Sequence, residues 1–222
     1  MTDGVRTVLL VGATGLVGRE CLRLLLADPD VMRLVVLTRR PLPLEVGAAK
    51  LDAHVVDFAR LDEYAELFAV DQIICALGTT MRRAGSRERF RAIDYGLVLR
   101  IAQLGAARGV RHFLLVSSLG ASAESRVFYS RVKGELEDAV RALPFRSITI
   151  VRPSILLGKR GERRVREQIG KRLARLAPRR YRPVEASVVA ERLVHEAQLD
   201  APGIRVIEST ELRRQRRADA AR

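Results

Sequence analysis

The stretch Gly12-Ala13-Thr14-Gly15-Leu16-Val17-Gly18 decides the fold. It stands between an apolar run, Thr7–Val11, and a segment of helical periodicity, Leu16–Ala27, so it predicts a turn that joins a strand to a helix. The first glycine permits the tight turn, the second lets backbone amides approach a pyrophosphate, and the third allows the helix to pack closely on the strand. The amino terminus of the helix adds partial positive charge. We therefore expect a dinucleotide site formed by Gly12, Thr14, Gly15, Leu16, Val17 and Gly18.

The rest of the chain alternates strand-like apolar runs with segments of helical periodicity. The expected strands are Thr7–Val11, Leu34–Thr38, Ala53–Asp57, Gln72–Ala76, Phe113–Ser117, Ile148–Arg152 and Ile204–Glu208. The expected helices are Leu16–Ala27, Leu61–Phe68, Ile93–Arg108, Tyr129–Ala142, Arg163–Leu176 and Val188–Leu199. Because several strands are apolar at consecutive positions, we expect helices on both faces of the sheet. The pattern predicts an α/β fold with a doubly wound parallel sheet, built by one domain over residues 1–222, to which 156–200 contribute a small cap.

The end of the second predicted strand indicates which nicotinamide cofactor fits. NAD-binding chains usually carry an acid about twenty residues after the glycine loop, and this acid accepts the ribose 2′-hydroxyl. This chain instead reads Leu37-Thr38-Arg39-Arg40, and two guanidinium groups suit bidentate contact with a 2′-phosphate. NADP(H) is therefore favoured over NAD(H), with Arg39 and Arg40 as ligands. The alternative that both arginines are merely solvated stays open.

The composition is that of an ordinary globular domain, with 48% hydrophobic and 30% charged residues. The longest apolar runs are strand-sized and the start of the chain has no signal-peptide pattern, so we expect no membrane association. Cys21 and Cys75 lie in apolar surroundings without a CxxC motif, which predicts buried thiols in a reducing compartment and a cytoplasmic protein. His54, His112 and His195 lack the spacing of metal ligands, so no metal site is expected.

The net charge of +14 is concentrated in one stretch. Residues 159–182 contain eleven Lys or Arg residues against two Glu, and this stretch includes the helix predicted over Arg163–Leu176. Two interpretations stay open: a solvated helical face, or a surface that favours an anionic substrate or partner. No aromatic residue interrupts 159–180, and no helix-turn-helix or RNA-binding motif is visible. We therefore expect no sequence-specific nucleic-acid partner.

Further motifs resemble the short-chain dehydrogenase/reductase superfamily. The Gly12–Gly18 loop is similar to that of its atypical and extended members, and Tyr129-Ser130-Arg131-Val132-Lys133 is similar to its YxxxK element. More narrowly, Cys75–Thr80, Ser117–Ala121 and Tyr129–Glu135 resemble the human Tat-interacting oxidoreductase-like branch of atypical members. The superfamily resemblance covers about residues 5–160, and the branch resemblance extends more loosely to about residue 212.

The resemblance implies roles for individual residues. Tyr129 would be the general acid/base, Lys133 would favour the phenolate and hold the nicotinamide ribose, and Ser118 would hydrogen-bond the substrate carbonyl or hydroxyl. Ser117 is the weaker candidate for this last role and is expected beside the cofactor. The remaining implied cofactor contacts are Asp57 and Phe58 at the adenine, Leu77, Gly78 and Thr79 along the fourth strand, and Pro153 and Ser154 at the carboxamide.

The tyrosine–lysine pair makes chemical sense without the resemblance. A phenol is a poor base at neutral pH because its reference pKa is about 10, and a nearby ammonium stabilises the phenolate. Residues four apart on a helix share one face, which supplies that proximity. One departure from the superfamily is Asp94, where an asparagine often helps to hold a water in a proton relay. Asp94 either alters this relay or complements the dipole of its helix.

Three functions stay open on the sequence alone. The leading hypothesis is an NADP(H)-dependent oxidoreductase that acts on a carbonyl or alcohol of a small molecule. The basic segment would favour an anionic substrate. The second is an NADP(H)-sensing regulatory protein with little or no turnover. The third is a sugar-nucleotide epimerase or dehydratase, although fewer than seventy residues follow Pro153 to form a substrate domain. The substrate, the direction of the reaction and the choice between monomer and homodimer cannot be read from these motifs.

Overall fold

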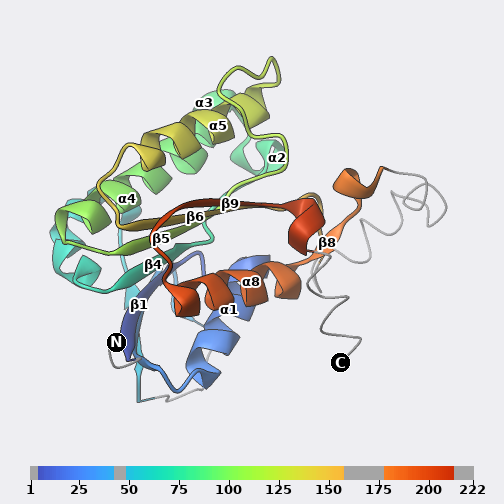
Figure 1. Ribbon diagram of the computed structural model, residues 1–222. Helices are drawn as coiled ribbons and strands as arrows, with labels where there is room; N and C mark the ends of the chain where they lie inside the picture. Colours follow the sequence, from blue (N-terminus) through green and yellow to red (C-terminus); the bar gives the residue numbers. More distant parts are fainter. Residues whose placement is uncertain (1–4, 43–48, 158–177, 213–222) are drawn as a thin grey trace, which may run out of the picture.

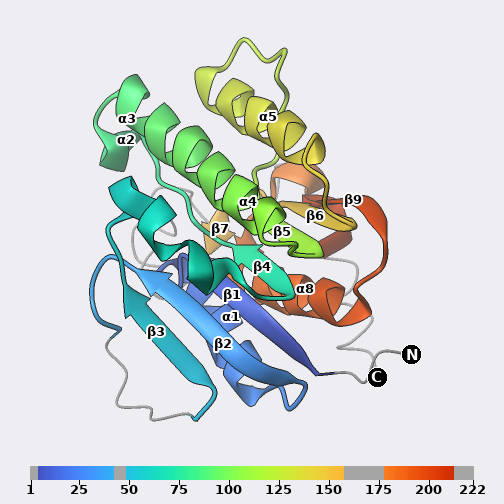
Figure 2. The ribbon, with the colours of Figure 1, turned by 90° about the vertical axis from the view of Figure 1, so that its left-hand side faces the viewer.

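The computed structural model describes residues 5–42, 49–157 and 178–212. Within these residues, seven parallel strands form a sheet in the order β3-β2-β1-β4-β5-β6-β9 (Figure 1 and Figure 2). Its strands are β1 (Arg6–Val11), β2 (Val31–Thr38), β3 (Leu51–Val55), β4 (Gln72–Cys75), β5 (His112–Val116), β6 (Ser147–Arg152) and β9 (Gly203–Glu208). A small second sheet pairs β7 (Leu156–Leu157) with β8 (Val184–Glu185). The strand order changes direction between β1 and β4, where doubly wound sheets bind their ligands.

Helices cover both faces of the sheet. On one face, α1 (Leu16–Ala27) and α8 (Ala186–Leu199) lie side by side (Figure 1). The other face carries the 3-10 helix η1 (Phe58–Phe68), α4 (Val98–Ala107) and α5 (Phe128–Arg141). The shorter elements are α2 (Met81–Ala84), α3 (Arg87–Arg91), the π-helical turn η2 (Ala92–Leu97) and the 3-10 turn η3 (Arg179–Tyr181).

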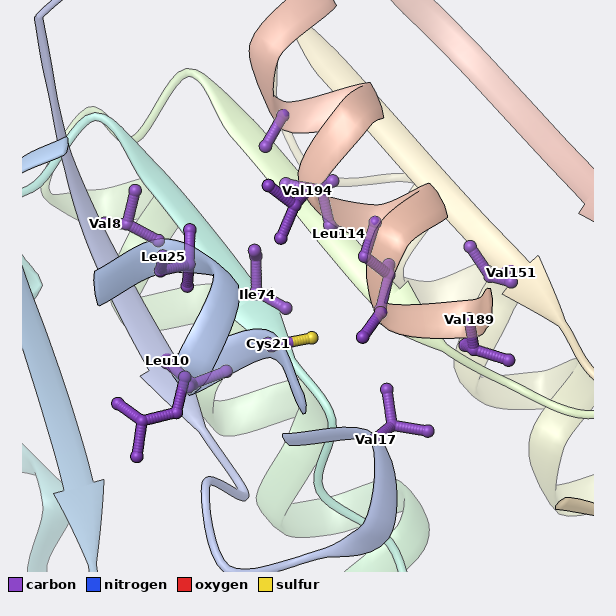
Figure 3. Close-up of a cluster of buried hydrophobic side chains, with 14 of the residues drawn as sticks. Val8, Leu10, Val17, Cys21, Leu25, Ile74, Leu114, Val151, Val189 and Val194 are labelled. Carbon is purple, nitrogen blue, oxygen red and sulfur yellow. The ribbon is translucent and has the colours of Figure 1, made fainter. Parts of the chain in front are cut away.

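The alternation of side chains along β1 accounts for the two layers. Val8 and Leu10 join the apolar cluster under α1 and α8, whereas Leu9 and Val11 join the cluster under α4 and α5. All four side chains are fully buried, and each such burial stabilises the fold by about 1.5–3 kcal/mol. Figure 3 shows the first cluster, in which side chains of α1 and α8 meet over the sheet.

The predicted fold class is confirmed, and every predicted strand forms. The helix predicted over Leu16–Ala27 has these bounds, while the segment predicted over 93–108 begins with the π-helical turn η2 before α4. The sequence does not predict α2, α3, β7 or β8, because elements this short show no periodicity. The helix predicted over Arg163–Leu176 lies outside the described residues.

Only part of the predicted cap over 156–200 is described. The helix α8 falls within this range, yet it packs on α1 and contributes Val189 and Leu193 to the core. The cap assignment is therefore wrong for this helix, which belongs to the central layers. Its amphipathic pattern suits either position, because periodicity shows that one face is buried but not what it is buried against.

Candidate functional site

The loop Gly12–Gly18 has the geometry that its glycines predict. Gly12 has a φ of 92°, and a Cβ on it would lie 2.6 Å from the carbonyl oxygen of Ala76. A Cβ on Gly18 would lie 2.1 Å from the carbonyl oxygen of Gly12. The amide of Gly15 closes the turn by donating to that same oxygen at 2.9 Å. A side chain at position 12 or 18 would have to displace backbone, so the seating of α1 against β1 and β4 depends on glycine.

A pocket of about 420 Å³ lies along this loop at the carboxyl ends of β1, β2 and β4. The residues predicted to contact the cofactor that line this pocket are Gly12, Thr14, Gly15, Arg39, Phe58, Leu77, Gly78 and Thr79. The lining residues that sequence reasoning missed are Ala13, Leu37, Thr38, Ala76, Arg83, Ile93 and Leu97. Three of these residues, Ala13, Thr38 and Ala76, directly flank predicted cofactor-binding residues, so the glycine loop and the strand ends signal them. Arg83 has no such signal, because it comes from the short helix α2.

Other residues predicted to contact the cofactor do not line the pocket. Leu16 is partly buried, and Val17 and Gly18 face the core under α1. Arg40 is exposed. Asp57 is also exposed, and its carboxylate accepts a hydrogen bond from the Ala59 amide at 2.9 Å, so it caps η1. These residues support or flank the pocket, and contact between Asp57 and an adenine stays a prediction.

A buried ion pair lies beside the pocket, just past the end of β4. The Nζ of Lys133 lies 2.7 Å from Oδ1 of Asp94, and the two side chains are 4% and 1% exposed. The other oxygen of this carboxylate accepts from the Thr79 amide at 2.8 Å. A Cβ on Gly78 would lie 3.2 Å from the Asp94 oxygen and 3.6 Å from the Lys133 nitrogen. Because Gly78 has no side chain, the Lys133 ammonium can lie next to the pocket. Asp94 pairs with this ammonium, so it does more than complement the dipole of its helix.

Tyr129 lies in the first turn of α5, one helical turn before Lys133. Its half-buried ring packs on Phe90 of α3, with 5.2 Å between the ring centroids. Phe90 itself is fully buried and also contacts Phe128, at 6.0 Å between centroids. The unpredicted helix α3 thus supports the tyrosine, because it supplies the aromatic side chain against which the ring rests.

The loop after β5, which carries Ser118, is held on two sides. A Cβ on Gly134 of α5 would lie 2.1 Å from the carbonyl carbon of Ser122, so helix and loop are in direct backbone contact. On the other side, the Leu119 amide donates to the carbonyl oxygen of Pro153 at 2.9 Å. The half-buried Ser118 contacts the Leu119 carbonyl oxygen at 3.4 Å. The fold therefore holds the loop that carries Ser118 between α5 and the loop after β6.

Ser117 belongs to a buried polar network. Its hydroxyl donates to the carboxylate of Glu137, which is fully buried in α5. Arg152 and Arg141 also donate to this carboxylate, at 2.6 Å and 2.9 Å, and Arg152 reaches Glu208 at 3.0 Å. The Glu137 and Glu208 carboxylates raise the pKa of Arg152. The network ties β5, α5, β6 and β9 together, and it engages the Ser117 hydroxyl that was expected beside the cofactor.

The loop after β6 is also fastened by hydrogen bonds. The hydroxyl of Ser154 donates to the carbonyl oxygen of Arg182 and accepts from Ser209 at 3.0 Å. Pro153 is buried. These contacts join the end of β6 to the segments before β8 and after β9, and contact of Pro153 and Ser154 with a carboxamide stays a prediction.

Cys21 and Cys75 are buried free thiols. Burial raises the pKa of the Cys21 thiol to about 12 and that of Cys75 to about 11, so both stay protonated at neutral pH. In residues 5–42, 49–157 and 178–212, His, Cys, Asp and Glu side chains form no group of three or more that could hold a metal ion. Across the same ranges, every helix is too short or too polar to cross a membrane.

Comparison with known proteins identifies the family. A family model described as NAD(P)H-binding matches residues 12–180. Protein HTATIP2 of Rattus norvegicus is 37% identical over 169 residues, which cover 75% of this chain and 69% of the relative. Protein FMP52 of Candida albicans is 38% identical over 156 residues, or 69% and 68% of the two chains. The chain belongs to the NAD(P)H-binding family. Within it, the chain is an atypical short-chain dehydrogenase/reductase of the HTATIP2 branch.

Solved structures share the fold. A short-chain dehydrogenase/reductase family oxidoreductase from Burkholderia thailandensis is similar with a TM-score of 0.71 and 21% identity, over 98% of this chain and 97% of that one. MoeE5, solved with UDP-glucose and NAD, gives a TM-score of 0.69 and 16% identity, over 93% and 79%. At these identities the similarity concerns the fold. Binding of an NAD(P) cofactor follows from the family, whereas the choice between NAD and NADP does not.

The predicted cytoplasmic location is wrong. The relatives from Candida albicans, Emericella nidulans and Aspergillus terreus are named as mitochondrial proteins. The prediction rested on buried thiols and on strand-sized apolar runs. Neither observation separates one reducing compartment from another, because both describe how the chain folds rather than where it resides.

Proposed function

We propose that the protein is an NADP(H)-dependent oxidoreductase that interconverts a carbonyl and an alcohol on a small molecule. The observation that carries the proposal is the position of Lys133. Its buried ammonium lies beside Gly78 at the pocket, on the helix whose first turn carries Tyr129. A cation here favours the negative charge that develops on a phenol acting as a base, and burial strengthens the interaction.

The pocket suits the proposed cofactor. Backbone amides at Gly12–Gly15 and the amino terminus of α1 suit a pyrophosphate, and Gly12 leaves the loop close to the backbone at Ala76. Phe58 and Leu97 supply apolar surface for an adenine, and Arg39 supplies a cation near the end of β2. When bound, the nicotinamide supplies or accepts the hydride, so the protein has to handle only the proton.

The residues of the chain divide the remaining work. Tyr129 gives a proton to the carbonyl oxygen during reduction, or takes one from the hydroxyl during oxidation. Lys133 favours the phenolate form and binds the nicotinamide ribose. Ser118, in the loop held between α5 and the loop after β6, hydrogen-bonds the same substrate oxygen and orients it. The ring contact with Phe90 restrains Tyr129, which lowers the entropic cost of reaching the reactive geometry.

Turnover tests the proposal. Aldehydes, ketones and quinones should be screened with NADPH, and active substrates repeated with Tyr129→Phe. We expect this variant to lose turnover while it keeps NADPH affinity, because only the hydroxyl is removed. Lys133→Ala should damage both. Tyr64→Phe, in a half-buried tyrosine of η1 away from the site, is the matched control. Substantial turnover in Tyr129→Phe would reject the assignment.

One observation favours a second function, that of an NADP(H)-sensing regulatory protein with little turnover. Asp94 neutralises Lys133 at 2.7 Å, which weakens the field that the ammonium exerts on Tyr129. A sensor would bind NADPH with the same residues and lack activity with every substrate class in the screen. Tight NADPH binding without turnover, unchanged in Tyr129→Phe, would support this function over the first.

A further inference from the structure

We infer that Arg83 is a second specificity residue for the cofactor, and that it binds the 2′-phosphate of NADP(H) together with Arg39 from the opposite wall of the pocket. The inference rests on the proposed preference for NADP(H) and identifies a partner for Arg39 that the sequence does not indicate. Arg39 follows β2, whereas Arg83 belongs to α2, more than forty positions later.

Local structure holds the backbone of Arg83 at the pocket. Thr80 caps α2, since its side chain accepts from the Arg83 amide at 3.3 Å. The helix ends after one turn at Gly85, which has a φ of 81° and whose amide donates to the Met81 carbonyl oxygen at 3.0 Å. Ala84, next to Arg83, is 5% exposed and anchors the turn in the cluster around Phe90. Arg83 therefore projects from a fixed turn, although its own side chain is exposed.

The sheet order puts the two arginines on different walls. In the sheet, β2 and β4 pair with opposite edges of β1, and the glycine loop follows β1. Arg39 extends the β2 side and Arg83 comes from the element after β4, yet both line the one pocket of about 420 Å³. Arg40, the other arginine predicted from the sequence, is exposed and does not line it.

The charges of the site leave both guanidinium groups available. In the described part of the chain, neither Arg39 nor Arg83 lies within 4.0 Å of a carboxylate, whereas Arg91 pairs with Glu135 and Arg33 with Asp52. A phosphate monoester carries about −1.5 to −2 charges at pH 7, so one guanidinium leaves it only partly neutralised. Two guanidinium groups match this charge, and each presents paired N–H donors to phosphate oxygens.

The adenosine end is the part of the cofactor that these residues face. Loop amides and the start of α1 already suit the pyrophosphate. In this fold the adenosine ribose binds at the end of the second strand, where Arg39 and Phe58 line the pocket. A second cation on the facing wall is therefore suited to the 2′-phosphate, the group that distinguishes NADP(H) from NAD(H).

Calorimetric titration with NADPH and NADH tests the inference on the unaltered protein and on Arg83→Ala. We expect Arg83→Ala to weaken NADPH binding about tenfold, the loss typical of a charged hydrogen bond, and to change NADH binding less than about twofold. The NADPH affinity of Arg83→Lys should lie between those of the unaltered protein and Arg83→Ala, because lysine keeps the positive charge but lacks the paired N–H donors of the guanidinium group. The matched control is Arg82→Ala, an exposed arginine of the same helix that does not line the pocket, which should change neither affinity.

Other results would overturn the inference. Equal losses of NADPH and NADH in Arg83→Ala would assign Arg83 to the shared part of the cofactor, and no loss would exclude a contact. An Arg82→Ala loss as large as that of Arg83→Ala would indicate a general field rather than a contact. If the unaltered protein binds both cofactors equally, the proposed NADP(H) preference fails, and that failure is visible before any variant is made. Competition by adenosine 2′,5′-bisphosphate against adenosine 5′-monophosphate repeats the test without the nicotinamide.

Discussion

Lys133 and Asp94 form an ion pair, with 2.7 Å between Nζ and Oδ1, where the cofactor pocket meets the helix that carries Tyr129. Both side chains are almost completely buried. In such a pair each charge is tolerated because of the other, so the removal of one partner leaves an uncompensated charge in the interior. The pair therefore links the stability of the fold to a residue proposed for catalysis.

Asp94→Asn should lower the free energy of unfolding by about 3 kcal/mol, the range for one removed partner of a buried pair. The amide oxygen of asparagine can still accept from the Thr79 amide, so the loss reports the charge. Urea unfolding measures it. The double variant Asp94→Asn/Lys133→Met should recover most of the loss, because no buried charge is left. Equal stability of Asp94→Asn and the unaltered protein would contradict a coupled pair.

Gly18→Ala should reduce both NADPH affinity and thermal stability. The added Cβ would lie 2.1 Å from the Gly12 carbonyl oxygen and 2.6 Å from its carbon, so the glycine loop must shift. Calorimetry and a thermal melt measure the two effects. Gly96→Ala is the control, since the nearest atom to its Cβ would be 4.0 Å away. An unshifted NADPH affinity in Gly18→Ala would show that the loop does not bind the pyrophosphate.

NADPH should bind more tightly than NADH by one to two powers of ten, or about 1.4 kcal/mol for each. Arg39→Ala should lose NADPH affinity and leave NADH nearly unchanged. Arg40→Ala should act in the same direction with a smaller effect, because Arg40 does not line the pocket. The same titrations give all three comparisons, and a larger loss in Arg40→Ala than in Arg39→Ala would reject this geometry.

His112 should make the protein less stable in mild acid. Its side chain is 1% exposed, and burial lowers its pKa, which the carboxylate of Asp200 opposes only in part. Unfolded histidine has a pKa of about 6.5, so below this pH the unfolded state binds more protons than the folded state. The stability that is full above about pH 6.5 is then lost as the pH falls toward the folded-state pKa.

Urea unfolding at several pH values from about 7.5 to about 5 measures this loss. His112→Gln should flatten the dependence, since it removes the titrating group and keeps a polar side chain near Thr149, which His112 contacts at 3.0 Å. Both proteins keep His54 and His195, so the difference between their pH dependences isolates His112. Identical slopes for the two proteins would assign the pH dependence elsewhere.

The strands and the glycine loop could be predicted because their causes are local. Buried parallel strands need consecutive apolar residues, as in Val8–Val11, and Gly12 and Gly18 meet backbone that only glycine can approach. The order of strand and helix then leaves few topologies. For the same reason the half of the pocket at the ends of β1, β2 and β4 was accessible from the sequence.

The remaining parts of the site depend on tertiary contacts that have no pattern in the chain. The residues of the Lys133–Asp94 pair are 39 positions apart, and Ser117 meets Glu137 across 20. Arg83 reaches the pocket from a one-turn helix that is too short for periodicity. A sequence motif can name residues such as Ser117, but it cannot show that a hydroxyl is already engaged by a neighbouring carboxylate.

The packing of α8 on α1 has a consequence for how the chain is made. The Gln198 side chain donates to the Asp28 carboxylate across 170 positions, so this contact between the two helices forms only after residue 198 has been synthesised. Until then the apolar side of α1, including Cys21 and Leu25, has no cover from α8. Contacts this distant in sequence slow folding, and the exposed apolar side of α1 is prone to aggregation until α8 packs on it. The nascent protein therefore passes through a stage in which the Gly12–Gly18 loop has been synthesised but the side of α1 that packs on α8 is still exposed.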